Sequence, residues 1–376
     1  MKSQQKSRLE SGKEIAEQPD QIRRIDDNWY QVKAQSLKFE SWYDVVKTES
    51  GLVCDCPDHL WRDVKCKHIY GVEISLNIRT QVQTRIPKII KPLEITSCIN
   101  CKSQNIRKSG IRHNKSGDIQ RMICYDCNKT FSVNIGFEYM KHNPQAITTA
   151  MQLYFSGESL RNVAKSLKLL GTEVSHQTVF YWIKKYTSIL QSYSDSLKPQ
   201  VSDTWRADEL YLRVKGNQKY LYALMDDETR FWISQEVANT KFTQDLQGLF
   251  TESKIAVGKK PKVFITDGAR NFHDAYLKEF WTNRKETRTE HISHIHLKGD
   301  MNNNKMERMN GEIRDREKVM RGLKNKDTPI LKGYQVFHNY FRPHQGLNGK
   351  TPAEACGIKI IGDNKWITMI QNAENQ

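Results

Sequence analysis

The sequence predicts a multidomain protein in which small cysteine-rich modules and a pair of helices precede a larger α/β domain. Three observations lead to this prediction. Seven of the eight cysteines fall into two clusters, of which the second ends at Cys127. Residues 144–186 then repeat apolar side chains at helical spacing, and from residue 199 the apolar residues alternate as they do in strands. The 376 residues leave room for two to four domains.

Charge is the strongest feature of the composition. The chain has 59 Lys and Arg residues against 43 Asp and Glu residues, which gives a formal net charge of +16. This excess favours a polyanionic partner, and double-stranded DNA is the first candidate. The sequence has no apolar run long enough to predict a membrane partner. It also has no apolar segment near the N-terminus of the kind that predicts secretion. We therefore expect a cytoplasmic location, where reducing conditions require a role for the cysteines other than disulfides.

The first cysteine cluster follows an N-terminal stretch of low hydrophobicity. Residues 1–27 are rich in Lys, Glu, Gln and Ser and are predicted to be a disordered tail. Alternating aromatic and apolar residues after residue 28 predict short strands that lead into C-x-C and C-x-H pairs. These pairs offer a tetrahedral Zn²⁺ a closed set of four ligands, Cys54, Cys56, Cys66 and His68. In outline, residues 28–75 resemble the SWIM zinc finger.

A second cluster follows a stretch that contains two prolines among Lys, Arg and Ile. Residues 76–95 are predicted to be an extended linker. Residues 96–135 then hold two C-x2-C pairs, Cys98, Cys101, Cys124 and Cys127. Such paired knuckles are typical of a zinc ribbon, in which a structural Zn²⁺ replaces a core too small to fold alone. The basic residues between the knuckles suit contacts with phosphates, although a merely solvated hairpin is the alternative.

Residues 144–198 are predicted to form a helix-turn-helix. Pro144 suits the start of a first helix, Gly171 marks a later turn, and Ser175 suits the N-cap of the last helix. The last helix would enter the major groove of DNA, and generic packing of a helical hairpin is the alternative. Its outward side chains are the predicted DNA contacts, namely His176, Gln177, Thr178, Tyr181, Lys184 and Lys185.

The α/β domain is predicted to span residues 199–356 and to be followed by a C-terminal tail over residues 357–376. Asp208 lies on the aliphatic side of the first of three strands, which implies a buried carboxylate. Asp267 ends a short apolar strand, where open α/β sheets place their sites. Glu307 lies on a helix beside a stripe of Met306, Met309, Ile313 and Met320.

Three histidines precede this helix and need a separate interpretation. These are His291, His294 and His296, of which the period-two pair His294 and His296 points one way and lacks acidic or thiol company. We interpret them as residues of a strand or of its rim rather than as metal ligands.

The three acids suggest a specific chemistry. Two Mg²⁺ or Mn²⁺ ions that promote phosphoryl transfer need oxygen ligands from separate elements. Asp208, Asp267 and Glu307 would supply them on a β-β-β-α-β-α chain order. Glu312 is the alternative third acid, but it lies about 140° round the helix from Glu307.

At this point the chain resembles the DDE transposases of bacterial and archaeal insertion sequences, which have a ribonuclease-H-like core. The resemblance runs from about Trp205 to Ala355. Its carriers are W-R-A-D-E at 205–209, T-D-G at 266–268, the Asn-rich run into Glu307, Arg314, R-G-L-K at 321–324, Y-F-R-P-H at 340–344, Leu347, Gly349 and T-P-A-E at 351–354.

The resemblance implies a function. The three acids would bind catalytic metal, and Arg314 would lie near donor DNA. The protein would bind the ends of its insertion sequence, and it would cleave and join DNA as a homodimer or higher oligomer, in the nucleoid of a prokaryotic cell. Two alternatives are a domesticated DNA-binding regulator and a stand-alone nuclease of the same fold. The retained acids argue against the first and the upstream modules against the second.

Overall fold

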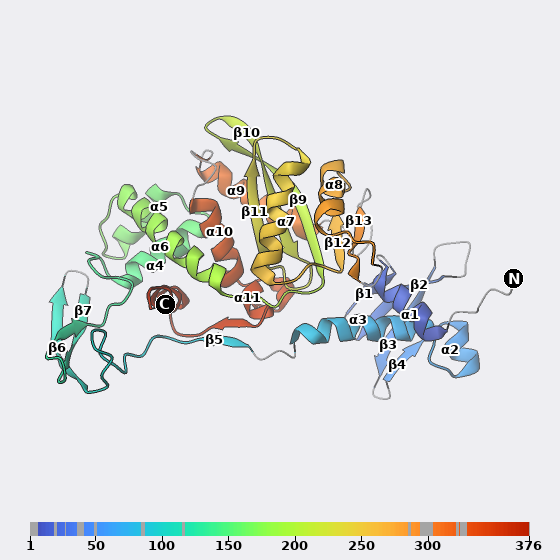
Figure 1. The fold of residues 1–376 in the computed structure, drawn as a ribbon, viewed down its shortest axis with the longest axis horizontal. Helices are drawn as coiled ribbons and strands as arrows, with labels where there is room; N and C mark the ends of the chain where they lie inside the picture. The colour runs from blue at the N-terminus through green and yellow to red at the C-terminus, as the bar shows by residue number, and fades with distance from the viewer. Residues whose placement is uncertain are drawn as a thin grey trace.

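The computed structural model describes residues 7–18, 21–26, 28–35, 41–48, 51–83, 87–114, 117–284, 287–293, 304–320, 323 and 329–375. Figure 1 shows an elongated molecule, with an N-terminal module at one end and a three-stranded ribbon at the other. A five-stranded sheet with its helices lies between them. None of the helices in the described ranges is long and apolar enough to span a membrane.

The N-terminal module packs three helices with a four-stranded antiparallel sheet. Its elements are α1 (Arg8–Glu17), β1 (Ile22–Arg24), β2 (Trp29–Lys33), β3 (Trp42–Thr48), β4 (Gly51–Cys54), α2 (Pro57–Arg62) and α3 (Lys67–Gln83). The prediction of a disordered tail is wrong for α1 and β1. Ser7 and Glu10 form a capping box, and Ile15 is buried against Gly71. A Cβ atom at Gly12 would lie 2.4 Å from the Tyr70 Cβ atom, so this glycine allows α1 and α3 to approach closely.

The predicted linker and C-terminal tail pair with each other. Strand β5 (Lys88–Ile90) lies parallel to β14 (Ile358–Ile360), and α3 extends into the predicted linker as far as Gln83. After β14, α12 (Lys365–Glu374) buries Trp366, Met369 and Ile370 in the main core. The expectation of a tail over residues 357–376 is therefore wrong, because these apolar side chains share one face of a capped helix.

The ribbon is an antiparallel sheet of β6 (Ile106–Asn114), β7 (Gly117–Cys124) and β8 (Thr130–Ser132). Its core is small and consists of Cys98, Cys124 and Phe131. So few buried apolar groups cannot offset the entropy of ordering some thirty residues, which is consistent with stabilisation by a metal.

The helical region contains α4 (Pro144–Phe155), α5 (Leu160–Leu169) and α6 (His176–Ser196). The predicted start, turn and cap are confirmed: Pro144 opens α4, Gly171 has a φ of 81°, and the Ser175 hydroxyl accepts from the Thr178 N–H. These helices do not have a core of their own. Helix α6 packs against α10 (Pro329–Tyr340) and α12, and Phe155 stacks on Phe337 at 5.9 Å.

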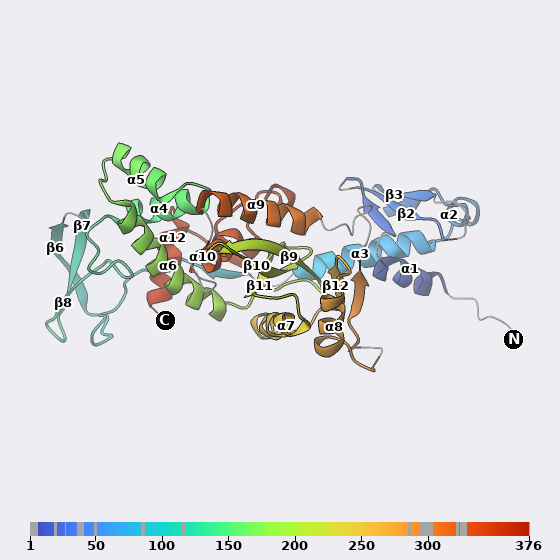
Figure 2. The same ribbon diagram turned by 90° about the horizontal axis from the view of Figure 1, so that it is seen from above.

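The five-stranded sheet has the order β11-β10-β9-β12-β13. Its elements are β9 (Thr204–Val214), β10 (Asn217–Asp226), β11 (Trp232–Ala238), α7 (Thr243–Val257), β12 (Val263–Thr266), α8 (Arg270–Glu279), β13 (Glu290–Ser293) and α9 (Asn304–Met320). The predicted three-strand meander is confirmed, since β9, β10 and β11 pair antiparallel. Strand β12 then pairs parallel to β9, and β13 pairs parallel to β12. Figure 2 shows α7 and α8 on one side of the sheet and α9 on the other.

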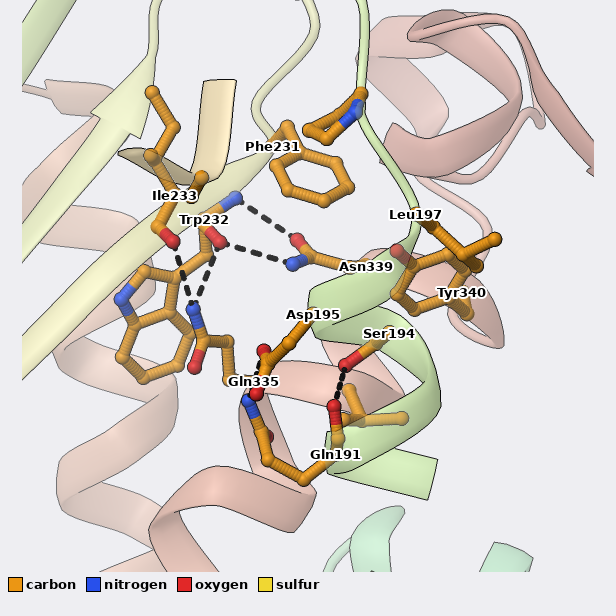
Figure 3. A pocket seen from close by; sticks show the side chains of 13 residues that line it. Gln191, Ser194, Asp195, Leu197, Phe231, Trp232, Ile233, Gln335, Asn339 and Tyr340 are labelled. Atoms are coloured by element: carbon orange, nitrogen blue, oxygen red, sulfur yellow. Dashed lines mark hydrogen bonds between the residues drawn. The ribbon is translucent and has the colours of Figure 1, made fainter. Parts of the chain in front are cut away.

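Helix α10 covers the edge strand β11. The Asn339 amide donates to the Trp232 carbonyl at 2.9 Å and accepts from the Trp232 N–H at 2.8 Å. The Gln335 amide donates to the Trp232 and Ile233 carbonyls (Figure 3). These bonds satisfy edge groups that would otherwise attract another strand. The small pocket beside them, of about 40 Å³, is thus lined in part by polar side chains that already form these hydrogen bonds. The remaining elements are a 3-10 turn (Gln345–Leu347) and α11 (Pro352–Ala355).

Candidate active site

Asp208 lies in the middle of β9, at the centre of the sheet. The alternation of β9 buries Leu210, Leu212 and Val214 on the same face, and Asp208 is itself only 9% exposed. Its Oδ1 accepts from the Glu209 N–H at 2.9 Å, and its Oδ2 accepts from the Asn310 Nδ2 at 2.8 Å. The structure therefore confirms the predicted buried carboxylate and shows how α9 holds it.

Asp267 follows the last residue of β12, as predicted. Strand β12 pairs with β9 in parallel, with Ile265 opposite Arg206. Two residues further along, the same register brings Asp267 beside Asp208, and neighbouring strands lie about 4.8 Å apart. Gly268 has a φ of 88°, which lets the chain turn into α8 directly after the exposed Asp267 carboxylate. The Asp267 Oδ1 accepts from the Ala269 N–H at 3.0 Å.

Glu307 is exposed in the first turn of α9, beside a buried stripe. Met306, Met309 and Ile313 are at most 2% exposed and pack in the main core. The predicted stripe is thus confirmed for these three residues, whereas the side chain of Met320 lies outside the described residues. Because the stripe fixes the rotation of α9, Glu307 lies at its edge and is exposed to solvent.

The three carboxylates act on one another. Burial and the charges of Asp267, Glu209 and Glu307 together raise the pKa of Asp208 to about 7, although the hydrogen bond from the Glu209 N–H lowers it. The three predicted acids therefore converge from β9, β12 and α9. Their oxygens do not all lie within 4.8 Å of one another, since among the described residues only two cysteine clusters meet that criterion.

The donor set suits hard divalent cations. Carboxylate oxygens are the ligands that Mg²⁺ and Mn²⁺ prefer, and a cation would offset the repulsion that raises the pKa of Asp208. Oxygens that do not all meet around a single ion are compatible with two ions about 4 Å apart, because each ion then needs only part of the set. The residues present therefore fit the metals that the sequence predicts.

Two charged clusters position α9, and sequence reasoning missed both. The Lys305 Nζ lies 2.9 Å from the Asp227 Oδ1, and the buried Arg206 guanidinium pairs with the same carboxylate. Burial opposes ionisation of Asp227, but Lys305 and Arg206 together lower its pKa to about 2. At the middle of the helix, the Arg316 guanidinium lies 3.9 Å from the centroid of the Tyr154 ring. Nothing in the spacing of these residues along the chain indicates that they meet.

Glu312, the alternative third acid, is already paired. The Arg342 guanidinium holds both of its oxygens, with Nη2 at 2.6 Å from Oε1, and the Arg308 Nε lies 3.7 Å away. The charge of Glu307 acts on Asp208, whereas that of Glu312 acts on Arg342. The geometry thus favours Glu307 as the third acid.

The part of the chain that carries this site matches a known family. Residues 202–344 match the model of a family described as a DDE domain, of the IS240 transposase type. These residues form a DDE domain of insertion-sequence transposases.

Curated relatives agree with this assignment of the DDE domain. Over 137 residues the chain is 31% identical to the transposase for insertion sequence-like element IS431mec of Staphylococcus aureus strain N315. It is equally similar to the transposase for insertion sequence element IS257 in transposon Tn4003 of Staphylococcus aureus. Each alignment covers 35% of this chain and 59% of the relative, so the chain spans less than two thirds of these relatives.

Solved structures give a weaker likeness. The integrase catalytic core domain of HTLV-2 in complex with magnesium has 16% sequence identity and a TM-score of 0.31, over 43% of this chain and 98% of that chain. A chain of the simian T-cell lymphotropic virus intasome in complex with PP2A regulatory subunit B56 gamma has 14% identity and a TM-score of 0.31, over 54% and 72%. TM-scores this low do not establish a common fold, so the DDE assignment comes from the sequence matches.

Upstream of the DDE domain, both cysteine clusters are assembled as ligand sets. The ligand atoms of Cys54, Cys56, Cys66 and His68 lie within 4.8 Å of one another, as do those of Cys98, Cys101, Cys124 and Cys127. The Sγ atoms are 3.7 Å apart in the pair Cys98–Cys127 and 3.5 Å apart in Cys101–Cys124. A tetrahedral Zn²⁺ with Zn–S bonds of about 2.3 Å separates its sulfurs by about 3.8 Å, so the donors fit this ion.

The predicted DNA contacts differ in accessibility. On α6, His176, Gln177, Tyr181 and Lys184 are exposed. Thr178 is half-buried, and its hydroxyl lies 3.0 Å from the Ser175 hydroxyl. Lys185 is also half-buried, with its Nζ 3.7 Å from the Met140 sulfur. Arg314 is exposed on α9, two turns after Glu307.

The histidines near the DDE site are arranged as packing residues. His291 lies on β13, as predicted, and its Nε2 is 2.9 Å from the Thr266 hydroxyl. Burial and the neighbouring His273 together lower the pKa of His291 to about 4. His294 and His296 lie outside the described residues.

Proposed function

We propose that this protein is a DNA transposase that binds the ends of its insertion sequence and catalyses DNA cleavage and strand transfer with Mg²⁺ or Mn²⁺. The observation that carries the proposal is the convergence of Asp208, Asp267 and Glu307 from three separate elements inside a DDE domain. Such convergence is costly for folding, since like charges repel, and it is explained most simply by a site that holds cations.

Each residue of the proposed site has a distinct role. Asp208, Asp267 and Glu307 would hold the ions, which when bound activate the attacking oxygen and stabilise the leaving oxygen. The Asn310 amide keeps the Asp208 Oδ2 fixed, and burial excludes water from this carboxylate. The buried stripe of α9 and the Lys305–Asp227 ion pair hold Glu307 at the edge of the site. The chain thereby positions a scissile phosphate for in-line attack by water and then by a DNA 3′-hydroxyl.

The modules upstream of the DDE domain would determine which DNA the protein binds. A SWIM-like zinc finger, a zinc ribbon and a helix-turn-helix, with two structural Zn²⁺ ions, suit binding to the element ends. The exposed face of α6 would contact the major groove, and Arg314 would contact donor DNA near the site. Because two ends must be held together for strand transfer, we propose that a homodimer or higher oligomer assembles on DNA, in a nucleoid-associated protein.

Cleavage by the full-length protein tests the proposal. The substrate is a duplex that carries the inverted repeat found beside the gene, and the variants are Asp208→Asn, Asp267→Asn and Glu307→Gln. Each should bind the duplex as the wild-type protein does and lose at least about a hundredfold in Mg²⁺-dependent cleavage, because a missing ligand spoils the ion geometry. Glu312→Gln is the matched control and should keep most of the activity.

Two results would contradict the proposal. Activity that survives in Glu307→Gln but disappears in Glu312→Gln would show that the third acid is wrongly assigned. Specific binding without any cleavage by the wild-type protein would favour the domesticated regulator.

A further inference from the structure

A pocket lined in part by α9, the helix that carries Glu307, does not include the proposed catalytic acids. It has a volume of about 170 Å³ and is lined by residues of β10, the turn after β10, α9, α10 and the segment after α10. The lining residues that matter here are Arg230, Lys305, Arg308, Glu312, His338 and His344. Pockets for drug-sized molecules measure about 300–1,000 Å³, so this one suits a single small charged group.

The charges around the pocket do not balance. Lys305 is paired with Asp227, and Glu312 is held by Arg342. Arg308 has only a distant contact with Glu312, at 3.7 Å. Among the residues that the structure describes, the Arg230 guanidinium has no hydrogen bond or ion pair, although it is half-buried. Burial lowers the pKa of Arg230, and the charge of Arg308 lowers it further, against the charges of Asp227 and Glu312, which raise it.

Two buried histidine nitrogen atoms also indicate a small charged ligand. His338 is 2% exposed, and its Nδ1 has no partner within the described residues; the Nε2 of His344 is likewise buried and unpaired there. Buried polar atoms without partners are rare unless water or a ligand completes them. The Nε2–H tautomer of His344 would add a donor to those of the two arginines.

The backbone around Arg230 is also unusual. Arg230 has a φ of 56°, in the left-handed region that a residue with a Cβ atom rarely adopts. A Cβ atom on Gly346 would lie 2.2 Å from an Arg230 Nη atom, so the guanidinium rests where only glycine leaves space. The chain therefore holds a partly buried, unpaired guanidinium at a cost in backbone strain.

We propose that this pocket binds a backbone phosphate of the DNA strand beside the scissile phosphate, through Arg230, Arg308 and His344. A phosphodiester has one negative charge and two free oxygens, and arginine binds such a group with paired donors. Arg308 lies about 100° round α9 from Glu307, so the pocket is on another flank of the same helix, and a DNA strand that crosses α9 from the acids would bring one of its phosphates to the pocket. The proposal rests on the proposed function, and it adds a site that clamps the cleaved strand.

The test measures binding and cleavage separately, with the full-length protein and zinc retained. In Arg230→Gln, the affinity for the end duplex should fall about tenfold, and the slope of log affinity against log salt should become shallower by about one. Lys278→Gln removes the same single charge from an exposed position at the far end of α8 and should change neither value. Gly346→Ala keeps every charge but displaces the guanidinium, so its loss of affinity should approach that of Arg230→Gln.

Neutral methylphosphonates placed one at a time near the cleavage position identify the phosphate. At one position the substitution should weaken binding of the wild-type protein about tenfold and have no further effect on Arg230→Gln. If the losses simply add at every position, or if abasic sites but no methylphosphonates show the coupling, the phosphate pocket is refuted. If the coupling appears in binding while the wild-type protein cleaves nothing, the pocket stands and the proposed transposase activity fails.

Discussion

Replacing Asp208 by Asn should stabilise the protein at alkaline pH when Mg²⁺ and Mn²⁺ are absent. The folded-state pKa of about 7 lies about three units above the ordinary value of 3.8, which corresponds to about 4 kcal/mol against the ionised form. This penalty is absent below pH 4, grows as the pH rises toward 7, and is complete above it. Asn loses one of the two hydrogen bonds that Asp208 accepts, at about 1 kcal/mol. The net gain at pH 8 should be about 2–3 kcal/mol.

Calorimetry of the full-length protein between pH 4 and 9 measures this effect. The unfolding transition of the DDE domain should occur about 4–10 °C higher in Asp208→Asn at pH 8, and the two proteins should differ little at pH 4. Chelators are avoided because they would also remove zinc. Added Mg²⁺ should stabilise the wild-type protein at pH 8 and leave the variant unchanged. A variant that is less stable than the wild type at pH 8, with no dependence on pH, would refute the reasoning.

Three further predictions concern two ion-paired acids near the site and the zinc ligands. In urea unfolding, Glu312→Gln should lose about 1–3 kcal/mol, because Arg342 is left without its partner, and an unchanged stability would contradict this. Asp227→Asn should lose about 3–5 kcal/mol near neutral pH, because the buried Arg206 and the half-buried Lys305 are left without a counter-charge. Since the pKa of Asp227 is lowered to about 2, its contribution is present above pH 4 and disappears toward pH 2, where wild type and variant should converge. Elemental analysis should find two zinc ions per chain, and one ion in Cys127→Ser, whose ribbon should become sensitive to proteases; an unchanged zinc content would disprove the ribbon site.

Local sequence patterns predicted the position of a residue correctly wherever a single helix or strand determines that position. The alternation of β9 placed Asp208 on the buried face, and the helical stripe of α9 placed Glu307 at its edge. The cysteine spacings predicted two ligand sets, which are both assembled. The composition of the two ends of the chain led to the wrong prediction of tails. A few apolar residues, such as Ile15 and Trp366, are enough to dock a short helix on an existing core.

Contacts between residues that are far apart in the chain could not be predicted, because no local sequence pattern indicates which distant side chains meet. The residue types near Glu307 and Glu312 are alike, and only the tertiary structure distinguishes these acids, since Arg342 pairs with Glu312 and the charge of Glu307 acts on Asp208. The same holds for the Asp227 cluster, the contact between Asn310 and Asp208 and the pocket around Arg230, because the residues that meet there lie far apart along the chain. The sequence by itself determined which residue types could form the site and on which face of each element they lie. The packing of α9 across the sheet determined which of them face one another, because electrostatic interactions depend on distance in space and not on separation along the chain.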